Sequence, residues 1–181
     1  MTTEPMIDKP ALLEAIRQVY RLRIERLTFL LRGWVSYCYL AECAEGQRYF
    51  LKLYDDRELT PFAASSCDFY LPLTFQLCTS GILPHIACPV RTESGGFTAR
   101  CGSQLLILFH FIEGKVCGGG SLSSDILARL AGLLGILHKR AVQLEVEQPL
   151  VERFEIAFKA GLLGGFESLA NVTPGDRHGK Q

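Results

Sequence analysis

The sequence predicts an α+β protein in which an antiparallel sheet and one long helix precede a second, helical part. Three observations lead to this prediction. Short β-rich runs separated by turn residues fill residues 24–54, a long apolar segment follows Pro61, and leucines at helical spacing fill residues 121–140. With 181 residues, the chain can form one good core, or one small domain and part of a second.

The first ordered segments are a helix and three strands. Residues 11–20 have apolar side chains at helical spacing, and Asp8 and Pro10 suit the start of a helix. The β-rich runs that follow predict a three-stranded antiparallel meander with a tight turn at Gly46. Its expected strands are residues 25–32, 35–43 and 47–54.

A long helix is predicted over residues 62–79. Thr60 suits its N-cap, Pro61 suits its first turn, and Gly81 follows its end. Pro72 lies inside this segment and removes the hydrogen bond to the carbonyl group of Asp68. We therefore expect either a kink near Asp68 or a restart of the helix at Pro72, and we favour the kink.

The remainder of the chain predicts more strands, a connection and further helices. The expected strands are residues 86–92, 97–101 and 104–112. Glycine-rich residues 113–120 lack a periodic pattern and predict a boundary between two lobes. A helix over residues 121–140, a weaker helix over 150–160 and a polar, disordered tail over 171–181 complete the prediction. The expected domains are therefore 1–112, the linker 113–120, the helical part 121–170, and the tail.

Composition excludes several classes of function. Lys and Arg total 19, as do Asp and Glu, so the net charge is zero and a nucleic-acid partner is disfavoured. Seven cysteines include no paired CxxC spacings, which argues against a zinc site and favours free thiols in a reducing compartment. No apolar run is long enough to span a bilayer, and residues 1–10 lack a signal core. We expect a soluble, cytoplasmic protein.

Lys52 is the most informative single residue. It lies in the run Tyr49-Phe50-Leu51-Lys52-Leu53, where a charge among apolar side chains requires an internal ion pair or an anionic ligand such as a phosphate. The alternative is a lysine that extends from an edge strand and pairs with a surface acid.

Several motifs occur in a recognisable order. The strand containing Lys52 is followed by a helix end at residues 77–81, by Pro89-Val90, by the run Phe111-Ile112-Glu113-Gly114, and by Leu134-Gly135-Ile136-Leu137-His138. Over about residues 10–160 this order resembles the N-terminal part of the aminoglycoside phosphotransferases, which include choline kinase relatives, and most of all the enzymes that modify spectinomycin-type antibiotics. The resemblance implies a protein-kinase-like small lobe followed by the first helices of a truncated helical lobe.

The resemblance also implies roles for individual residues in binding ATP. Lys52 would neutralise the nucleotide phosphates, and Asp68 would hold its ammonium group, because Asp68 precedes Gly81 by thirteen residues (81 minus 68), where the family has an acid. The family usually has Glu there, and Glu58 is the second candidate. The alternative is that Asp68 is a solvated residue on the helix surface with no role in binding.

Two further segments complete the implied nucleotide site. Gly33 and Ser36 belong to the turn that folds over the phosphates in this family. The hinge strand, composed of His110, Phe111 and Ile112, would offer backbone groups to the adenine edge. Without the resemblance, the apolar run that ends in this strand predicts a strand of the hydrophobic core.

The catalytic part of the family pattern is missing. Its members activate a substrate hydroxyl with an aspartate in a His-Gly-Asp motif and bind Mg²⁺ through a following asparagine and a later aspartate, and no such motif occurs in the 181 residues. We therefore identify no catalytic residue and no metal ligand. We expect a truncated phosphotransferase of antibiotic-resistance type that is inactive alone, with self-association through exposed helical surface. The alternatives are a non-catalytic nucleotide-binding module and a small interaction protein. The sequence leaves the small-molecule acceptor open.

Overall fold

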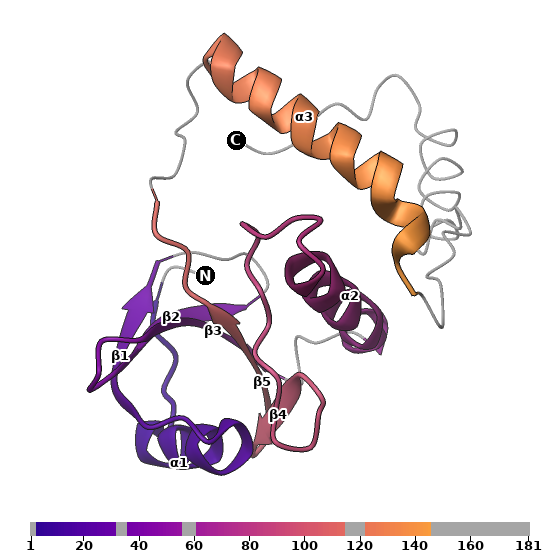
Figure 1. The fold of residues 1–181 in the computed structure, drawn as a ribbon. Helices are drawn as coiled ribbons and strands as arrows, with labels where there is room; N and C mark the ends of the chain where they lie inside the picture. The colour runs from indigo at the N-terminus through magenta and orange to yellow at the C-terminus, as the bar shows by residue number, and fades with distance from the viewer. Residues whose placement is uncertain (1–2, 32–35, 56–60, 115–121, 146–181) are drawn as a thin grey trace, which may run out of the picture. The chain divides into compact units, whose positions relative to one another are not determined.

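The structure is built around a five-stranded antiparallel sheet (Figure 1). The order across the sheet is β1-β2-β3-β5-β4, so that β3 is the middle strand. The computed structural model describes residues 3–31, 36–55, 61–114 and 122–145. The strands are β1 (Ile24–Leu30), β2 (Tyr37–Cys43), β3 (Arg48–Asp55), β4 (Thr98–Cys101) and β5 (Gln104–His110).

The predicted three-stranded meander is confirmed. β1 pairs with β2, and β2 with β3, both antiparallel. The turn between β2 and β3 contains Gly46, whose φ of 84° lies in the left-handed region that favours glycine. A hydrogen bond of 3.1 Å from the Gly46 N–H to the Cys43 carbonyl closes this turn.

The strand predicted over residues 86–92 is wrong. The segment makes a single bridge, between Pro89 and Phe109, alongside β5. Backbone bonds from the Val90 N–H to Leu108 and from the His110 N–H to Cys88, both 2.8 Å, hold the segment against β5. Proline has no N–H to donate, so a regular ladder cannot continue through Pro89. The other two predicted strands are confirmed as β4 and β5, with shorter ends.

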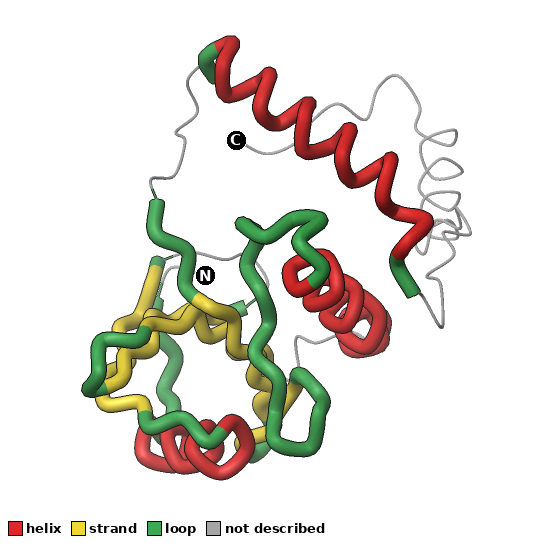
Figure 2. The backbone as a smooth tube through the Cα atoms, viewed as in Figure 1, coloured by secondary structure: helices red, strands yellow, loops and turns green. Residues whose placement is uncertain are grey.

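Helix α1 (Lys9–Tyr20) covers one face of the sheet. The Asp8 carboxylate caps it by accepting a 3.0 Å bond from the Ala11 N–H. The helix contacts both β1 and β4, the two edges of the sheet, and the sheet curves around it (Figures 1 and 2). The fully buried side chains in this core include Leu12, Ile16, Tyr39, Leu51, Leu53, Leu106 and Leu108.

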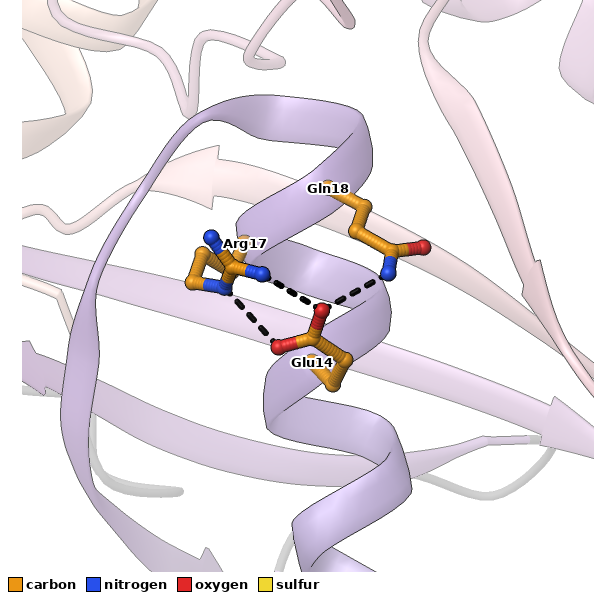
Figure 3. Close-up of polar contacts among 3 residues, drawn as sticks. All are labelled: Glu14, Arg17 and Gln18. Atoms are coloured by element: carbon orange, nitrogen blue, oxygen red, sulfur yellow. Dashed lines mark hydrogen bonds and ion pairs between the residues drawn. The ribbon is translucent and has the colours of Figure 1, made fainter.

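The exposed side of α1 has its own polar network (Figure 3). Glu14 accepts bonds of 2.8 and 2.6 Å from the Arg17 guanidinium and of 2.7 Å from the Gln18 amide. The spacings of three and four residues place these groups together on one helix face. The Arg17 hydrogen bonds, followed by that of Gln18, lower the pKa of Glu14 to about 2.

Helix α2 (Pro61–Thr79) lies against the other face of the sheet. It is a single helix that passes through Pro72, so the alternative in which a helix restarts there is wrong. Thr74, two residues later, donates its hydroxyl to the Tyr70 carbonyl at 2.6 Å. The buried residues of this second core are Cys67, Leu71, Phe97, Leu105, Ile107 and Phe109.

Helix α3 (Ser124–Arg140) confirms the predicted leucine-rich helix. Ser123 caps it, and a short 3-10 helix, η1 (Ala141–Gln143), follows it. None of its side chains is buried, and Leu127, Leu130 and Leu134 are each about half exposed. Self-association through this surface stays a prediction. The predicted helix 150–160, the tail 171–181 and most of the linker 113–120 lie outside the described residues.

Within the part of the chain that the structure describes, the helices are too short or too polar for any of them to serve as a membrane span.

The Tyr20 hydroxyl provides a test of the first core. It donates to the backbone carbonyls of Phe97, at 2.8 Å, and Leu106, at 3.3 Å, and so ties α1 to the sheet. We expect Tyr20→Phe to lower the free energy of unfolding by about 1–2 kcal/mol, because buried carbonyls lose a donor. Urea denaturation measures this.

Tyr37→Phe is the matched control for Tyr20→Phe. Tyr37 is half-buried, and its hydroxyl makes no hydrogen bond among the described residues. Its replacement should change the free energy of unfolding by less than about 0.5 kcal/mol. Equal effects of the two substitutions would contradict a structural role for the Tyr20 hydroxyl.

Candidate functional site

The side chain of Lys52 projects toward α2. Alternate residues of a strand point to opposite faces, and Leu51 and Leu53 belong to the core beneath α1. Lys52 therefore shares the other face with Phe50 and Tyr54, which pack in the core beneath α2. The sequence prediction that Lys52 lies in a strand is confirmed, and that strand is the middle one.

An aromatic ring supports the Lys52 ammonium group. Its Nζ lies 5.6 Å from the centroid of the Phe109 ring, on the neighbouring strand β5. Such a cation–π contact contributes about 0.5–2 kcal/mol, depending on exposure. Among the described residues, Lys52 has no carboxylate partner at ion-pair distance. An anionic ligand could therefore supply the missing negative charge.

The structure does not bring Asp68 into an ion pair with Lys52. Cys67 and Leu71 form the buried stripe of α2, and a helix turns by about 100° per residue, so Asp68 is rotated out to solvent. Cys67, rather than Asp68, faces the sheet. The pairing of Asp68 with Lys52 stays a prediction, and Glu58 lies outside the described residues.

The charges of Lys52 and Asp68 both act on the Cys67 thiol. Burial is the main cause that raises the pKa of Cys67. A hydrogen bond with Tyr70 lowers it, the Asp68 carboxylate raises it, and the Lys52 ammonium lowers it. The two side chains are therefore both close enough to Cys67 to influence it, although they do not pair with each other.

Neutral polar groups gather near Lys52 between the sheet and α2. We call this set the hydroxyl–thiol cluster; its members are Ser36, Cys38, Tyr54, Cys67 and Tyr70. The Ser36 hydroxyl lies 3.7 Å from the Cys38 sulfur, and the Cys67 thiol donates to the Tyr70 hydroxyl at 3.9 Å. The Tyr54 hydroxyl hydrogen-bonds with both Tyr70 and Ser36. The cluster satisfies polar groups but contributes no charge to balance Lys52.

Of the two predicted phosphate-loop residues, Ser36 and Gly33, only Ser36 lies within the described residues. Ser36 is buried just before β2 and belongs to the hydroxyl–thiol cluster. Contact between its hydroxyl and a phosphate stays a prediction, and would require that hydroxyl to exchange its present partners. Gly33 lies outside the described residues.

The hinge strand extends from the end of β5. His110 donates its backbone N–H to Cys88 at 2.8 Å, and Phe111 donates its N–H to Arg48 at 3.2 Å. The N–H of Ile112 has no backbone acceptor among the described residues. Of the three predicted hinge donors, Ile112 is thus the one that a ligand could use without displacing a backbone bond.

A pocket of about 400 Å³ lies beside the hinge strand. Its other wall comes from the end of α2 and from the connection between α2 and β4. The lining residues are Cys78, Pro84, His85, Ile86, Cys88, His110, Phe111 and Ile112. The structure therefore brings the three hinge residues together in one pocket, but Lys52, Ser36 and Asp68 do not line it.

Arg48 is a site residue that the sequence reasoning missed. Besides accepting from Phe111, it places its guanidinium 5.0 Å from the Phe111 ring centroid and forms an ion pair with Glu113. It thus holds the start of the linker against β3. The exposed arginine directly after the Gly46 turn carries no sequence signal for this role.

No three His, Cys, Asp or Glu side chains of the described segments are grouped so that they could hold a metal ion. We therefore assign no metal role to any of these residues.

Several solved structures of small-molecule phosphotransferases share this fold. Spectinomycin phosphotransferase APH(9)-Ia, solved with ADP and spectinomycin, matches at 16% identity with a TM-score of 0.57, covering 92% of this chain and 54% of that one. Amicoumacin kinase hAmiN, solved with AMP-PNP, Ca²⁺ and Ami, matches at 18% identity and a TM-score of 0.59, covering 92% and 55%. A microcompartment-associated aminopropanol kinase matches at 15% identity with a TM-score of 0.52, covering 83% of this chain and 46% of that one.

At these identities the similarity shows the fold. The described residues form an α+β arrangement of the protein-kinase-like small-lobe type, and the chain spans about half the length of the matched phosphotransferases, in their N-terminal part. No protein-family model matches the sequence, and no curated protein does.

The buried tyrosines of the hydroxyl–thiol cluster should make the stability of the fold depend on pH. Burial is the main cause that raises the pKa of Tyr54 and of Tyr70 in the fold. In the unfolded chain a phenol titrates near its ordinary pKa, about 10. Above that pH the unfolded state binds fewer protons than the folded state, so the free energy of unfolding falls as pH rises from about 9 to 11.

Tyr70→Phe removes one of these phenols and should make the fall in stability between about pH 9 and 11 shallower than in the wild type. Leu71→Val is the control, because it also destabilises the α2 core but removes no titrating group. Denaturation with urea at several pH values measures both slopes. Identical slopes for the wild type and Tyr70→Phe would refute the proposed linkage.

Proposed function

We propose that the described part of this chain is the nucleotide-binding lobe of an ATP-dependent phosphotransferase that acts on a hydroxyl group of a small molecule. The observation that carries the proposal is Lys52. It lies in the middle strand of a kinase-like small lobe, half-buried, without a carboxylate partner among the described residues. Matched proteins with this fold were solved with adenine nucleotides.

In this proposal Lys52 provides positive charge to the ATP phosphates. Phosphoryl transfer depends on positioning and on stabilisation of negative charge, and a lysine on this strand serves that purpose in kinases. The ring of Phe109 supports the ammonium group from one side. The backbone N–H of Ile112, which has no backbone acceptor among the described residues, would meet the edge of the adenine base, with His110 and Phe111 contributing the adjoining backbone.

Asp68 would join the site only after a change of side-chain position. Its carboxylate is exposed one residue beyond Cys67, and a rotamer change could bring it toward a bound nucleotide or its Mg²⁺ ion. Mg²⁺ accompanies ATP in the family that the sequence resembles and neutralises phosphate charge there. The described residues provide no set of ligands for it.

The proposal identifies the phosphate acceptor and the catalytic group less closely than it identifies the nucleotide. The matched structures contain spectinomycin or Ami, which supports an antibiotic-type hydroxyl as acceptor. The 181 residues contain no His-Gly-Asp motif, so we propose that they bind nucleotide but do not transfer its phosphoryl group unaided. The reduced state of the described cysteines supports a cytoplasmic setting.

A non-catalytic nucleotide-binding module is the second candidate function. The same observation favours it, since Lys52 and the hinge strand need no catalytic loop to bind ATP. A third reading, a small interaction protein in which Lys52 is incidental, predicts no nucleotide binding.

Calorimetric titration of ATP into the full chain, with and without Mg²⁺, tests the nucleotide site. We expect saturable binding, and we expect Lys52→Ala to weaken it by about tenfold or more, because a charge-assisted contact to phosphate contributes about 1.5–3 kcal/mol. Lys139→Ala is the control, since Lys139 is exposed on α3. Binding that is absent, or equal in all three proteins, would overturn the proposal.

Asp68→Asn tests the predicted pairing. If the carboxylate moves toward Lys52 or Mg²⁺ when ATP binds, the substitution should weaken Mg·ATP binding severalfold while leaving unfolding nearly unchanged, because the side chain is exposed in the free protein. Glu93→Gln, which replaces an exposed carboxylate paired with Arg21, is the control. Unaltered affinity in Asp68→Asn would leave Asp68 as a solvated helix residue.

A further inference from the structure

Arg48 makes three contacts with the segment that follows β5. It is the first residue of β3, and its backbone carbonyl accepts the Phe111 N–H at 3.2 Å. Its guanidinium lies 5.0 Å from the centroid of the Phe111 ring, and it forms an ion pair with Glu113. One residue of β3 therefore holds two of the residues that lead from the sheet into the linker.

These contacts extend the sheet by one residue pair. The regular ladder between β3 and β5 ends at Tyr49 and His110, whose rings lie 5.6 Å apart. Arg48 and Phe111 are the next pair in the same register, and residues opposite each other on antiparallel strands bring their side chains together on one face. Their hydrogen bond is the last backbone bond of the hinge strand among the described residues. The position of Ile112 thus depends on how well Phe111 is held.

The stacked guanidinium is the contact that we expect to hold Phe111 most strongly. The ion pair with Glu113 joins side chains that are 40% and 68% exposed, and ion pairs at such sites contribute little. A hydrogen bond at the end of a ladder opens easily unless side chains support it. The arginine side chain can give this support, because its guanidinium is planar, weakly hydrated and well suited to an aromatic face.

Arg48 and Lys52 share one face of β3. Side chains alternate along a strand, so residues four positions apart project to the same side. At a rise of about 3.3 Å per residue, the two residues are about 13 Å apart along the strand. A nucleotide that lies along β3 would therefore meet the hinge strand with its base and Lys52 with its phosphates.

We propose that Arg48 is a positioning residue for recognition of the nucleotide base. Stacked on Phe111, it fixes the hinge strand so that the Ile112 N–H, which has no backbone acceptor among the described residues, is in place before an acceptor atom of the base arrives. Arg48 acts through Phe111 and does not itself touch the nucleotide. The inference rests on the proposed nucleotide site, in which it assigns the base to Arg48 and the phosphates to Lys52.

Amide exchange followed by NMR, together with calorimetric titration of ATP, tests this role in the full chain. In the free protein, Arg48→Ala should accelerate exchange of the Phe111 amide severalfold and leave the Leu51 amide, within β3, unchanged. Its affinity for ATP should fall by about three- to tenfold, because preorganisation cannot contribute more than the cation–π contact that provides it. A residue that only stabilises the fold would instead accelerate exchange of both amides.

Arg91→Ala is the matched control. The Arg91 guanidinium also stacks on an aromatic ring, 4.4 Å from the centroid of Phe75, but it has no contact with the hinge strand among the described residues. Its replacement should change the affinity for ATP by less than about twofold. Arg48→Gln, which keeps most of the side-chain length but removes the cation, should weaken ATP binding as Arg48→Ala does. It decides the question if Arg48→Ala does not fold.

This inference and the proposed function fail in different ways. If the wild type does not bind ATP, both are overturned. If Lys52→Ala weakens ATP binding but the two Arg48 variants bind as tightly as the wild type, only the role of Arg48 is overturned. That role is also overturned if Arg48→Ala accelerates exchange of the Leu51 and Phe111 amides equally.

Discussion

The two-residue period of β3 is the constraint on which the candidate site depends. Leu51 and Leu53 are drawn into the fully buried core beneath α1, so the residue between them has to project toward α2. That residue is Lys52. Its position is thus set by the burial of its neighbours, and a register slip of one residue would place both leucines on the wrong face.

The surroundings of Lys52 decide what its charge can do. A buried ion pair would offset the charge at a large desolvation cost, and a partner that already satisfies the ammonium competes with a ligand. Here the ammonium faces the Phe109 ring and lies near the hydroxyl–thiol cluster, none of which carries a negative charge at neutral pH. Among the described residues no carboxylate is paired with the Lys52 ammonium group. A phosphate that binds there therefore does not have to displace one.

Sequence reasoning succeeded where the pattern was local. The meander, the leucine-rich helix and the strand position of Lys52 follow from side-chain periodicity and from turn residues such as Gly46. It failed at Pro89, where one missing N–H prevents a regular strand in an otherwise β-like segment. It could not decide whether Asp68 faces Lys52 or solvent, because the rotation of α2 about its axis depends on which residues the sheet buries.

The sequence by itself determined the order of the helices and strands apart from the segment around Pro89, which residues alternate on β3, and that an unusual lysine lies among them. Only the tertiary structure decided what surrounds that lysine and that Arg48 holds Phe111 and Glu113. The reason is physical. Periodicity reports which face a residue occupies within its own element, whereas these contacts join separate elements and depend on how helices and strands pack together.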